Sequence, residues 1–248
     1  LTSLISDWIV TSIGTEIGLP VLKPMAILID DSVQFKYKHV EVYNIVKRSY
    51  GANLAYKYFP DAKAYEPENP EADFDANIKD LIFLFDSFFL NIDRTKNNSN
   101  IFISGKEIYA VDFGACFLIK EIFDDIPYCR NVEIQKLLKR NIFYNENAAA
   151  ELLLQKLSSL SFKKVSDIIY GFPDEWLEGS RVSKNDLAEK LFNYINKDNH
   201  LKKALTVLKE IEIPSDEDLI KKQRENKKKF EEQVFKNVVP LIKKKKRF

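Results

Sequence analysis

Apolar residues recur at helical spacing near the start of the chain, at Ile5, Trp8, Ile9, Ile13 and Ile17. Residues three or four positions apart lie on the same face of a helix, so this pattern predicts an amphipathic helix. Gly18 and Pro20 follow the stripe and are expected to end it. A stable fold rarely begins with an uncovered amphipathic helix, so we expect a preceding segment or a separate chain to complete the fold there.

A second, wider apolar stripe lies between residues 73 and 90, at Ile78, Leu81, Ile82, Phe85, Phe88 and Phe89. A face of this width predicts a helix buried in the core, and Asp73 or Asp75 is placed to cap its N-terminus. The preceding residues 60–73 are rich in proline, alanine and acidic residues, which is typical of a turn or linker. They form the best candidate for a boundary between two lobes.

Shorter patterns predict strands. The run Met25–Ile29 is of strand type, residues 32–60 are interpreted as strands and loops, and Ile101–Ser104 with Glu107–Asp112 is predicted to form a hairpin. Beyond it the chain is predicted to be helical, most strongly at residues 147–160, 162–170, 184–195, 201–211 and 216–239. The sequence thus predicts an α+β chain with a small lobe over residues 1–72, a mostly helical lobe over 73–214 and a basic helical extension over 215–248.

The composition is that of a globular protein with a sizeable core, since 45% of the 248 residues are hydrophobic and 30% are charged. No apolar run approaches the roughly 20 residues of a transmembrane helix. The first ten residues lack the basic flank and cleavage site of a signal peptide. The two cysteines, Cys116 and Cys129, are too few for a disulfide framework or a cysteine zinc cluster. We therefore expect a cytoplasmic protein.

The net charge of +1 hides an asymmetry. Residues 221–248 hold 12 lysines and arginines against 3 acidic residues, whereas the preceding residues hold 26 against 34. Such a tail can bind nucleic acid or another acidic partner. Basic runs are more often solvated surface, and we favour that interpretation.

Acidic and amide side chains stand at both ends of the predicted hairpin. Asp93 and Asn98 precede it on a short loop, and Asp112 ends its second strand, which should bring the three together. Phosphoryl transfer requires a carboxylate near the acceptor hydroxyl and hard oxygen ligands for Mg²⁺. Asp and Asn are also common turn residues, so a merely polar loop is the alternative. The conjunction of loop, hairpin and second acid favours a site for nucleotide and metal.

The segment FFLNIDRTKNNSNIFISGKEIYAVDFGACF resembles the catalytic and metal-binding loops of the HipA-like kinases, in the branch whose loop reads N-x-D-R-T-x-x-N-x-N. This family is related in fold to the phosphoinositide lipid kinases. The opening SDWIVTSIGTEIGLPVLKP is similar to the family's αC helix segment, and residues 169–176 are similar to its I-x-x-x-P-x-x-W element. The resemblance covers most of the chain before the basic tail.

The resemblance implies a kinase-like two-lobed fold and a role for each site residue. Asp93 would be the catalytic base, and Asn98 and Asp112 would be the Mg²⁺ ligands that also hold the nucleotide. Arg94 would orient the catalytic loop or contact phosphate. Asp7 would stand where the family has the acid that pairs with the ATP-binding lysine.

That lysine and a glycine-rich phosphate loop are not found before Asp7. Three explanations are open: the loss of an N-terminal segment, a partner chain that supplies the missing strands of the small lobe, or a degenerate kinase that binds without transfer. The first two are favoured because Asp93, Asn98 and Asp112 are all present.

The resulting hypothesis is a kinase with an incomplete small lobe that transfers the γ-phosphoryl group of Mg²⁺-ATP to a hydroxyl, most simply a Ser or Thr of a protein. Relatives act as toxins of toxin–antitoxin systems, so the resemblance makes that role possible here. A non-catalytic module that binds nucleotide or a partner is one alternative. A kinase of a small molecule or lipid headgroup is another.

Overall fold

The computed structural model describes residues 2–30, 32, 40–66, 74–196 and 200–212. Within it residues 1–211 form one compact unit. The predicted basic helical extension, the alternative cap Asp73 and the predicted lobe boundary at residues 72 and 73 lie outside the described residues. The division into two lobes stays a prediction.

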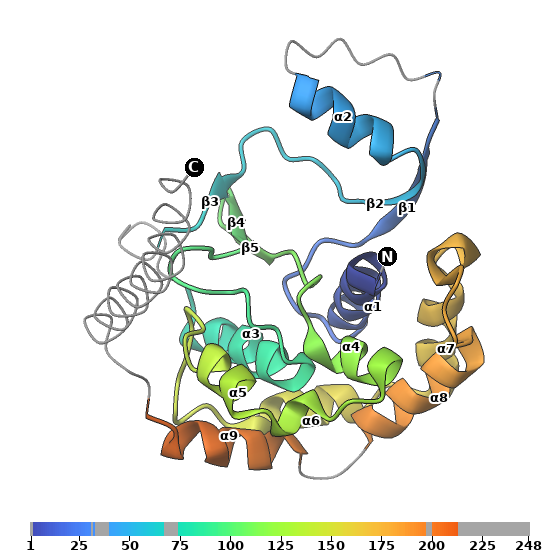
Figure 1. Cartoon of the computed structure of the whole chain (residues 1–248). Helices are drawn as coiled ribbons and strands as arrows, with labels where there is room; N and C mark the ends of the chain where they lie inside the picture. Colours follow the sequence, from blue (N-terminus) through green and yellow to red (C-terminus); the bar gives the residue numbers. More distant parts are fainter. Residues whose placement is uncertain (1, 31, 33–39, 67–73, 197–199, 213–248) are drawn as a thin grey trace, which may run out of the picture. The chain divides into compact units, whose positions relative to one another are not determined.

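Helices and short antiparallel sheets alternate along the chain, which confirms the α+β class (Figure 1). The helices are α1 (Thr2–Glu16), α2 (Val40–Arg48), α3 (Ala76–Phe89), α4 (Phe117–Asp124), α5 (Val132–Leu138), α6 (Ala150–Ser158), α7 (Phe162–Tyr170), α8 (Lys184–Ile195) and α9 (His200–Glu210), with single 3-10 turns η2 (Tyr128–Arg130) and η3 (Asp174–Leu177). The strands are β1 (Met25–Ile29), β2 (Gly51–Ala55), β3 (Lys63–Ala64), β4 (Ile101–Ser104) and β5 (Glu107–Ala110). None of the helices in the described part of the chain is both long and apolar enough to cross a membrane.

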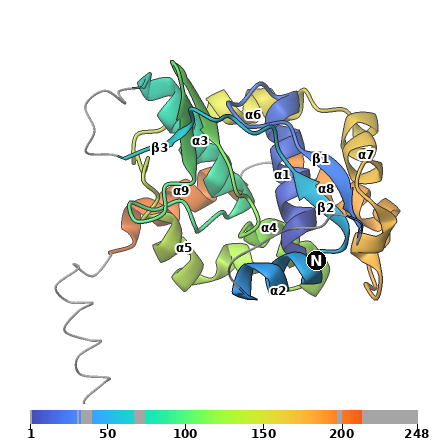
Figure 2. The same ribbon diagram turned by 90° about the horizontal axis from the view of Figure 1, so that it is seen from above.

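Helix α1 forms where the apolar stripe predicts it, but its apolar face is covered. It packs against α4, α7 and β2, and these neighbours surround it (Figure 1 and Figure 2). Ile9, Val10 and Ile13 are fully buried. Segments distant in sequence therefore cover the apolar face of α1, and completion of the fold by a preceding segment or a separate chain stays a prediction.

Helix α3 crosses the middle of the core, as its wide apolar stripe predicts (Figure 1). The Asp75 side chain caps it by accepting a hydrogen bond from the backbone N–H of Asn77. Leu90 ends it in the left-handed region at φ 55°. That reversal directs the chain into the loop that carries Asp93.

The strands form two small sheets. β1 pairs with β2, and β3, β4 and β5 follow each other in the second sheet, where β4 and β5 form the predicted hairpin. Residues 40–48 form α2, so the interpretation of residues 32–60 as only strands and loops is wrong there. No side chain of α2 is buried, and Leu28 of β1 is 73% exposed.

Candidate functional site

The loop after α3 holds the predicted base, Asp93, against two amides. The Nδ2 groups of Asn98 and Asn100 both donate to Asp93 Oδ2, at 2.9 and 3.3 Å. Asn100 adopts the left-handed region at φ 48°, where asparagine is one of the few favoured residues. The predicted pair Asp93 and Asn98 is therefore brought into contact.

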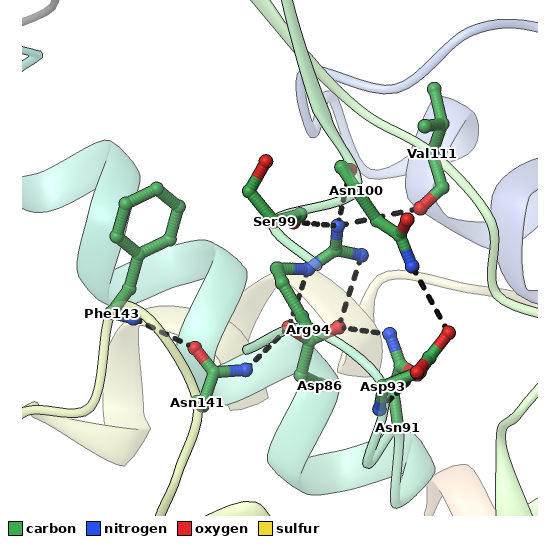
Figure 3. Close-up of polar contacts among 9 residues, drawn as sticks. All are labelled: Asp86, Asn91, Asp93, Arg94, Ser99, Asn100, Val111, Asn141 and Phe143. Carbon is green, nitrogen blue, oxygen red and sulfur yellow. Dashed lines mark hydrogen bonds and ion pairs between the residues drawn. The ribbon is translucent and has the colours of Figure 1, made fainter. Parts of the chain in front are cut away.

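The side chain of Arg94 is fully buried and lies beneath that loop (Figure 3). Its Nε donates to Asp86 Oδ2 at 2.7 Å, and its Nη2 donates to Asp86 Oδ1 at 3.3 Å. Two amides, Asn91 and Asn141, complete the hydrogen bonds of the same carboxylate. A charged pair survives burial only when its hydrogen bonds are satisfied in this way.

The other nitrogen of the guanidinium fastens the loop to the hairpin. Nη1 donates to the backbone oxygens of Ser99, Asn100 and Val111 at 3.3, 2.5 and 3.3 Å (Figure 3). The Val111 N–H also donates to the Asn100 oxygen at 3.0 Å. Of the two roles predicted for Arg94, this burial fits loop orientation, since the group has no access to a phosphate in solvent.

Asp112 follows Val111 at the end of the hairpin and is exposed to solvent. It adopts the left-handed region at φ 59°, an uncommon conformation for a non-glycine residue. The next residue, Phe113, is buried and donates its backbone N–H to Asp7 Oδ1 at 2.8 Å. Asp7 is thus brought beside the predicted metal-binding loop, across more than a hundred residues of sequence.

Asp7 and Asp112 line the same pocket, of about 600 Å³. Its walls are largely apolar and aromatic, with a lysine at one side, and the remaining lining residues are Leu22, Tyr56, Lys57, Tyr58, Phe59, Pro60, Ala62, Phe102, Tyr109 and Val111. A concave site with apolar walls and a few convergent polar groups is the usual form of a small-molecule or cofactor site. Asp93 and Asn98 are not among the lining residues.

Burial raises the pKa of Asp7, and the Phe113 N–H opposes that rise because it favours the carboxylate. Nearby Asp112 raises the same pKa further by charge repulsion. Burial and Asp7 together raise the pKa of Tyr56, so this phenol stays protonated near neutral pH. No lysine or arginine forms an ion pair with Asp7 in the described part of the chain.

The donor atoms near the pocket suit a hard cation. Asp93 and Asp112 supply carboxylate oxygens, and Asn98 turns its NH₂ group to Asp93, which leaves its amide oxygen for another partner. Mg²⁺ prefers such oxygen ligands, so these residues fit the ion. Clusters of three or more His, Cys, Asp or Glu side chains are absent from the described residues.

Comparison with known families identifies the chain. A sequence profile of the HipA-like kinases matches residues 1–212. The chain belongs to the HipA-like kinase family. Its membership confirms the resemblance carried by the loop and hairpin, and supports phosphoryl transfer as the chemistry of this HipA-like kinase.

Solved and curated proteins add little to the family assignment. The crystal structure of a Helicobacter pylori proinflammatory kinase, CtkA, is similar over 86% of this HipA-like kinase and 83% of that chain, at 13% identity and a TM-score of 0.45. A search of curated proteins finds no match.

Sequence reasoning missed two parts of the site in this HipA-like kinase. Asp86 appears in the sequence as a polar interruption of an apolar helix, and only its spacing of eight residues from Arg94 hints at the pair. Lys57 was not selected as a site residue, and the fold brings it to the pocket.

Proposed function

We propose that this chain is a Mg²⁺- and ATP-dependent kinase that transfers the γ-phosphoryl group to a hydroxyl, most simply a Ser or Thr of a protein. The observation that carries the proposal is the pocket lined by Asp7 and Asp112 beside a loop in which Asp93 and Asn98 are bonded together. The apolar and aromatic walls suit a nucleotide base, and the acids suit a metal–phosphate group.

Each residue has a stated part in this proposal. Asp93 accepts the proton of the incoming hydroxyl, while Asn98 holds its carboxylate in position. Asn98 and Asp112 hold Mg²⁺, which when bound would neutralise charge on the phosphates. Arg94 acts beneath the surface, where it keeps the loop and the hairpin end in register. Positioning of this kind supplies much of the catalysis in phosphoryl transfer.

Completion of the small lobe is part of the same proposal. The family acid Asp7 has no lysine partner among the described residues, and β1 and α2 expose apolar side chains. A preceding segment or a partner chain would supply the ATP-binding lysine and the phosphate loop. The kinase-like two-lobed arrangement and a toxin role within a toxin–antitoxin pair belong to this proposal too.

The first test is calorimetric titration of ATP into the chain with and without Mg²⁺, repeated on Asp112→Ala and Asp93→Asn. Binding that needs Mg²⁺ and is lost in Asp112→Ala supports the metal site. Asp93→Asn should bind ATP with wild-type affinity and transfer no phosphate. Binding that is independent of both Mg²⁺ and Asp112 would contradict the proposal.

A non-catalytic nucleotide-binding module is the second candidate. It is favoured by the observation that no lysine among the described residues forms an ion pair with Asp7. Phosphate transfer to protein, measured with labelled ATP and with any completing segment present, separates the two. In a module without turnover, wild type and Asp93→Asn would be indistinguishable in that assay. Label in a small molecule or lipid headgroup, with none in protein, would indicate the third candidate.

A further inference from the structure

Helix α1 holds both backbone polar groups of Phe113. The Ser6 Oγ donates to the Phe113 carbonyl oxygen at 2.8 Å, and the Phe113 N–H donates to Asp7 Oδ1 at 2.8 Å. Ser6 is 2% exposed and Phe113 is 1% exposed, so both bonds are shielded from water. Two consecutive side chains of one helix therefore bind the carbonyl group and the N–H of the same residue, and this pair of hydrogen bonds is called the grip below.

The residue directly before Phe113, Asp112, has a positive φ. Its φ is 59°, a region that aspartate enters more readily than most residues but that is still uncommon outside glycine. On its N-terminal side Val111 is bonded to Arg94 and to Asn100. On its C-terminal side the restraint comes from α1 through Phe113. Asp112 is thus fixed between two anchors that belong to different elements.

The close approach of α1 to this loop has a second sign. A Cβ atom at Gly114 would collide with the Ser3 Oγ and would touch the Ser3 carbonyl oxygen at 3.5 Å. Gly114 is not in the left-handed region, so its lack of a side chain serves this packing. The loop therefore lies against α1 at three residues of the helix, Ser3, Ser6 and Asp7.

We propose that Ser6 and Asp7 are positioning residues, which hold the Phe113 backbone and thereby keep Asp112 in the left-handed conformation that presents its carboxylate to a cation. The part of this proposal that concerns the cation rests on the function proposed above. Asp7 then acts as a hydrogen-bond acceptor within the chain, whether or not a lysine also reaches it. An acceptor oxygen is required for this role, and a negative charge is not.

That distinction makes Asp7→Asn and Asp7→Ala an informative pair. Asparagine keeps an acceptor oxygen at the same place and loses the charge, whereas alanine loses both. A role as charge partner of a lysine requires the carboxylate, so both variants would then fail alike. A positioning role predicts that asparagine is tolerated.

Hydrogen exchange at the Phe113 amide, followed by NMR on the full chain without nucleotide, measures the grip directly. Asp7→Ala should speed the exchange about 10-fold, the order of effect expected from losing one intramolecular hydrogen bond. Asp7→Asn should stay within about 3-fold of wild type. Ser12→Ala, which removes a hydroxyl from the same helix elsewhere, is the matched control and should leave the Phe113 rate unchanged.

Ser6→Ala keeps the test decisive if Asp7→Ala fails to fold. It removes the bond to the Phe113 carbonyl while Asp7 stays in place, and it should also speed exchange of the Phe113 amide by several-fold. Unchanged exchange in a folded Asp7→Ala or Ser6→Ala chain would overturn the proposal. Equal acceleration by Asp7→Asn and Asp7→Ala would overturn it as well, because charge would then be what matters.

The consequence for the cation is read from the Mg²⁺ concentration that half-saturates ATP binding. Asp7→Ala and Ser6→Ala should each raise it several-fold, while Ser12→Ala should not. With any completing segment present, the exchange pattern without Mg²⁺-dependent binding in wild type would support the grip and reject the proposed function. Normal Mg²⁺ dependence in a chain with accelerated Phe113 exchange would reject the link from the grip to the cation.

Discussion

Arg94 shows how a residue of a functional motif can work from inside the protein. The Asp-Arg motif suggests that the arginine contacts phosphate. The guanidinium of Arg94 is instead fully buried and donates hydrogen bonds to Asp86 and to three backbone oxygens. Arginine suits this task because its planar fork offers five donors in fixed directions. The residue therefore organises the site through the backbone.

Removal of either partner of this pair should be severe. Asp86→Ala or Arg94→Ala leaves an unpaired buried charge, and we expect the free energy of unfolding to fall by about 3–5 kcal/mol. Urea denaturation measures it. The exposed pair Lys163–Asp167 is the control, and its removal should cost less than about 1 kcal/mol.

The double variant Asp86→Leu with Arg94→Leu gives the sharper comparison. It removes both charges, so its loss should be well below the sum of the two single losses. An additive result would contradict the view that the two side chains act as one unit.

The charge of Asp7 should reduce stability near neutral pH. Its raised pKa means that the folded chain binds this proton more tightly than the unfolded chain does. Raising the pH between the two pKa values therefore lowers the free energy of unfolding, and the loss persists at higher pH. Asp7→Asn removes the penalty and should raise Tm by a few degrees at pH 7.

The control for this prediction is pH itself, with EDTA present to exclude metal effects. The advantage of Asp7→Asn should shrink as the pH falls toward and below 3.8, the ordinary pKa of an aspartate. A Tm difference that does not change with pH would show that something other than the charge sets it.

The candidate residues were readable from sequence to different degrees. Asp93, Asn98 and Asp112 could be selected because their spacing around a hairpin is rare. The contacts of Asp7 could not be read, since a hydrogen bond to a backbone N–H 106 residues away leaves no local pattern. Lys57 was missed for the same reason.

At the scale of elements, prediction succeeded where periodicity was long. Helices α7 and α8 lie at the predicted residues, and the β4–β5 hairpin is where a glycine turn separates two short apolar runs. Helix α2 was missed because valine, isoleucine and tyrosine are abundant in it, and these residues favour strands by propensity.

The packing of α1 on the loop after β5 gives a prediction at this scale. Gly114→Ala should disturb the contact with Ser3 and weaken Mg²⁺-dependent ATP binding several-fold. Ser3→Ala, combined with Gly114→Ala, removes the atom that the new Cβ meets and should restore most of the affinity.

Gly105→Ala provides the comparison in calorimetry. This glycine is in the left-handed region at φ 61° with open space around its Cα. Its replacement should cost about 1 kcal/mol of stability through backbone strain and leave the ATP affinity unchanged. If Gly105→Ala and Gly114→Ala had the same effect on affinity, the contact with Ser3 would not be the cause.

For the whole molecule, the compact unit of residues 1–211 and the family match over residues 1–212 coincide. We expect a chain ended after residue 212 to unfold cooperatively with the Tm of the full chain to within a few degrees. The full chain should differ mainly in its affinity for acidic partners, since residues 221–248 hold 12 basic residues against 3 acidic ones. Calorimetry and salt-dependent retention on a cation-exchange matrix measure the two properties.

The buried pair has a consequence for comparing genomes. The aspartate beneath the loop lengthens the loop motif to D-x4-N-x-D-R-x3-N-x-N, which here runs from Asp86 to Asn100. A homologue that keeps the visible acids but has lost the first aspartate would carry an arginine without its counterion. We expect such homologues to have lost stability or activity. Homologues in which both Asp86 and Arg94 are replaced should support the loop through other contacts.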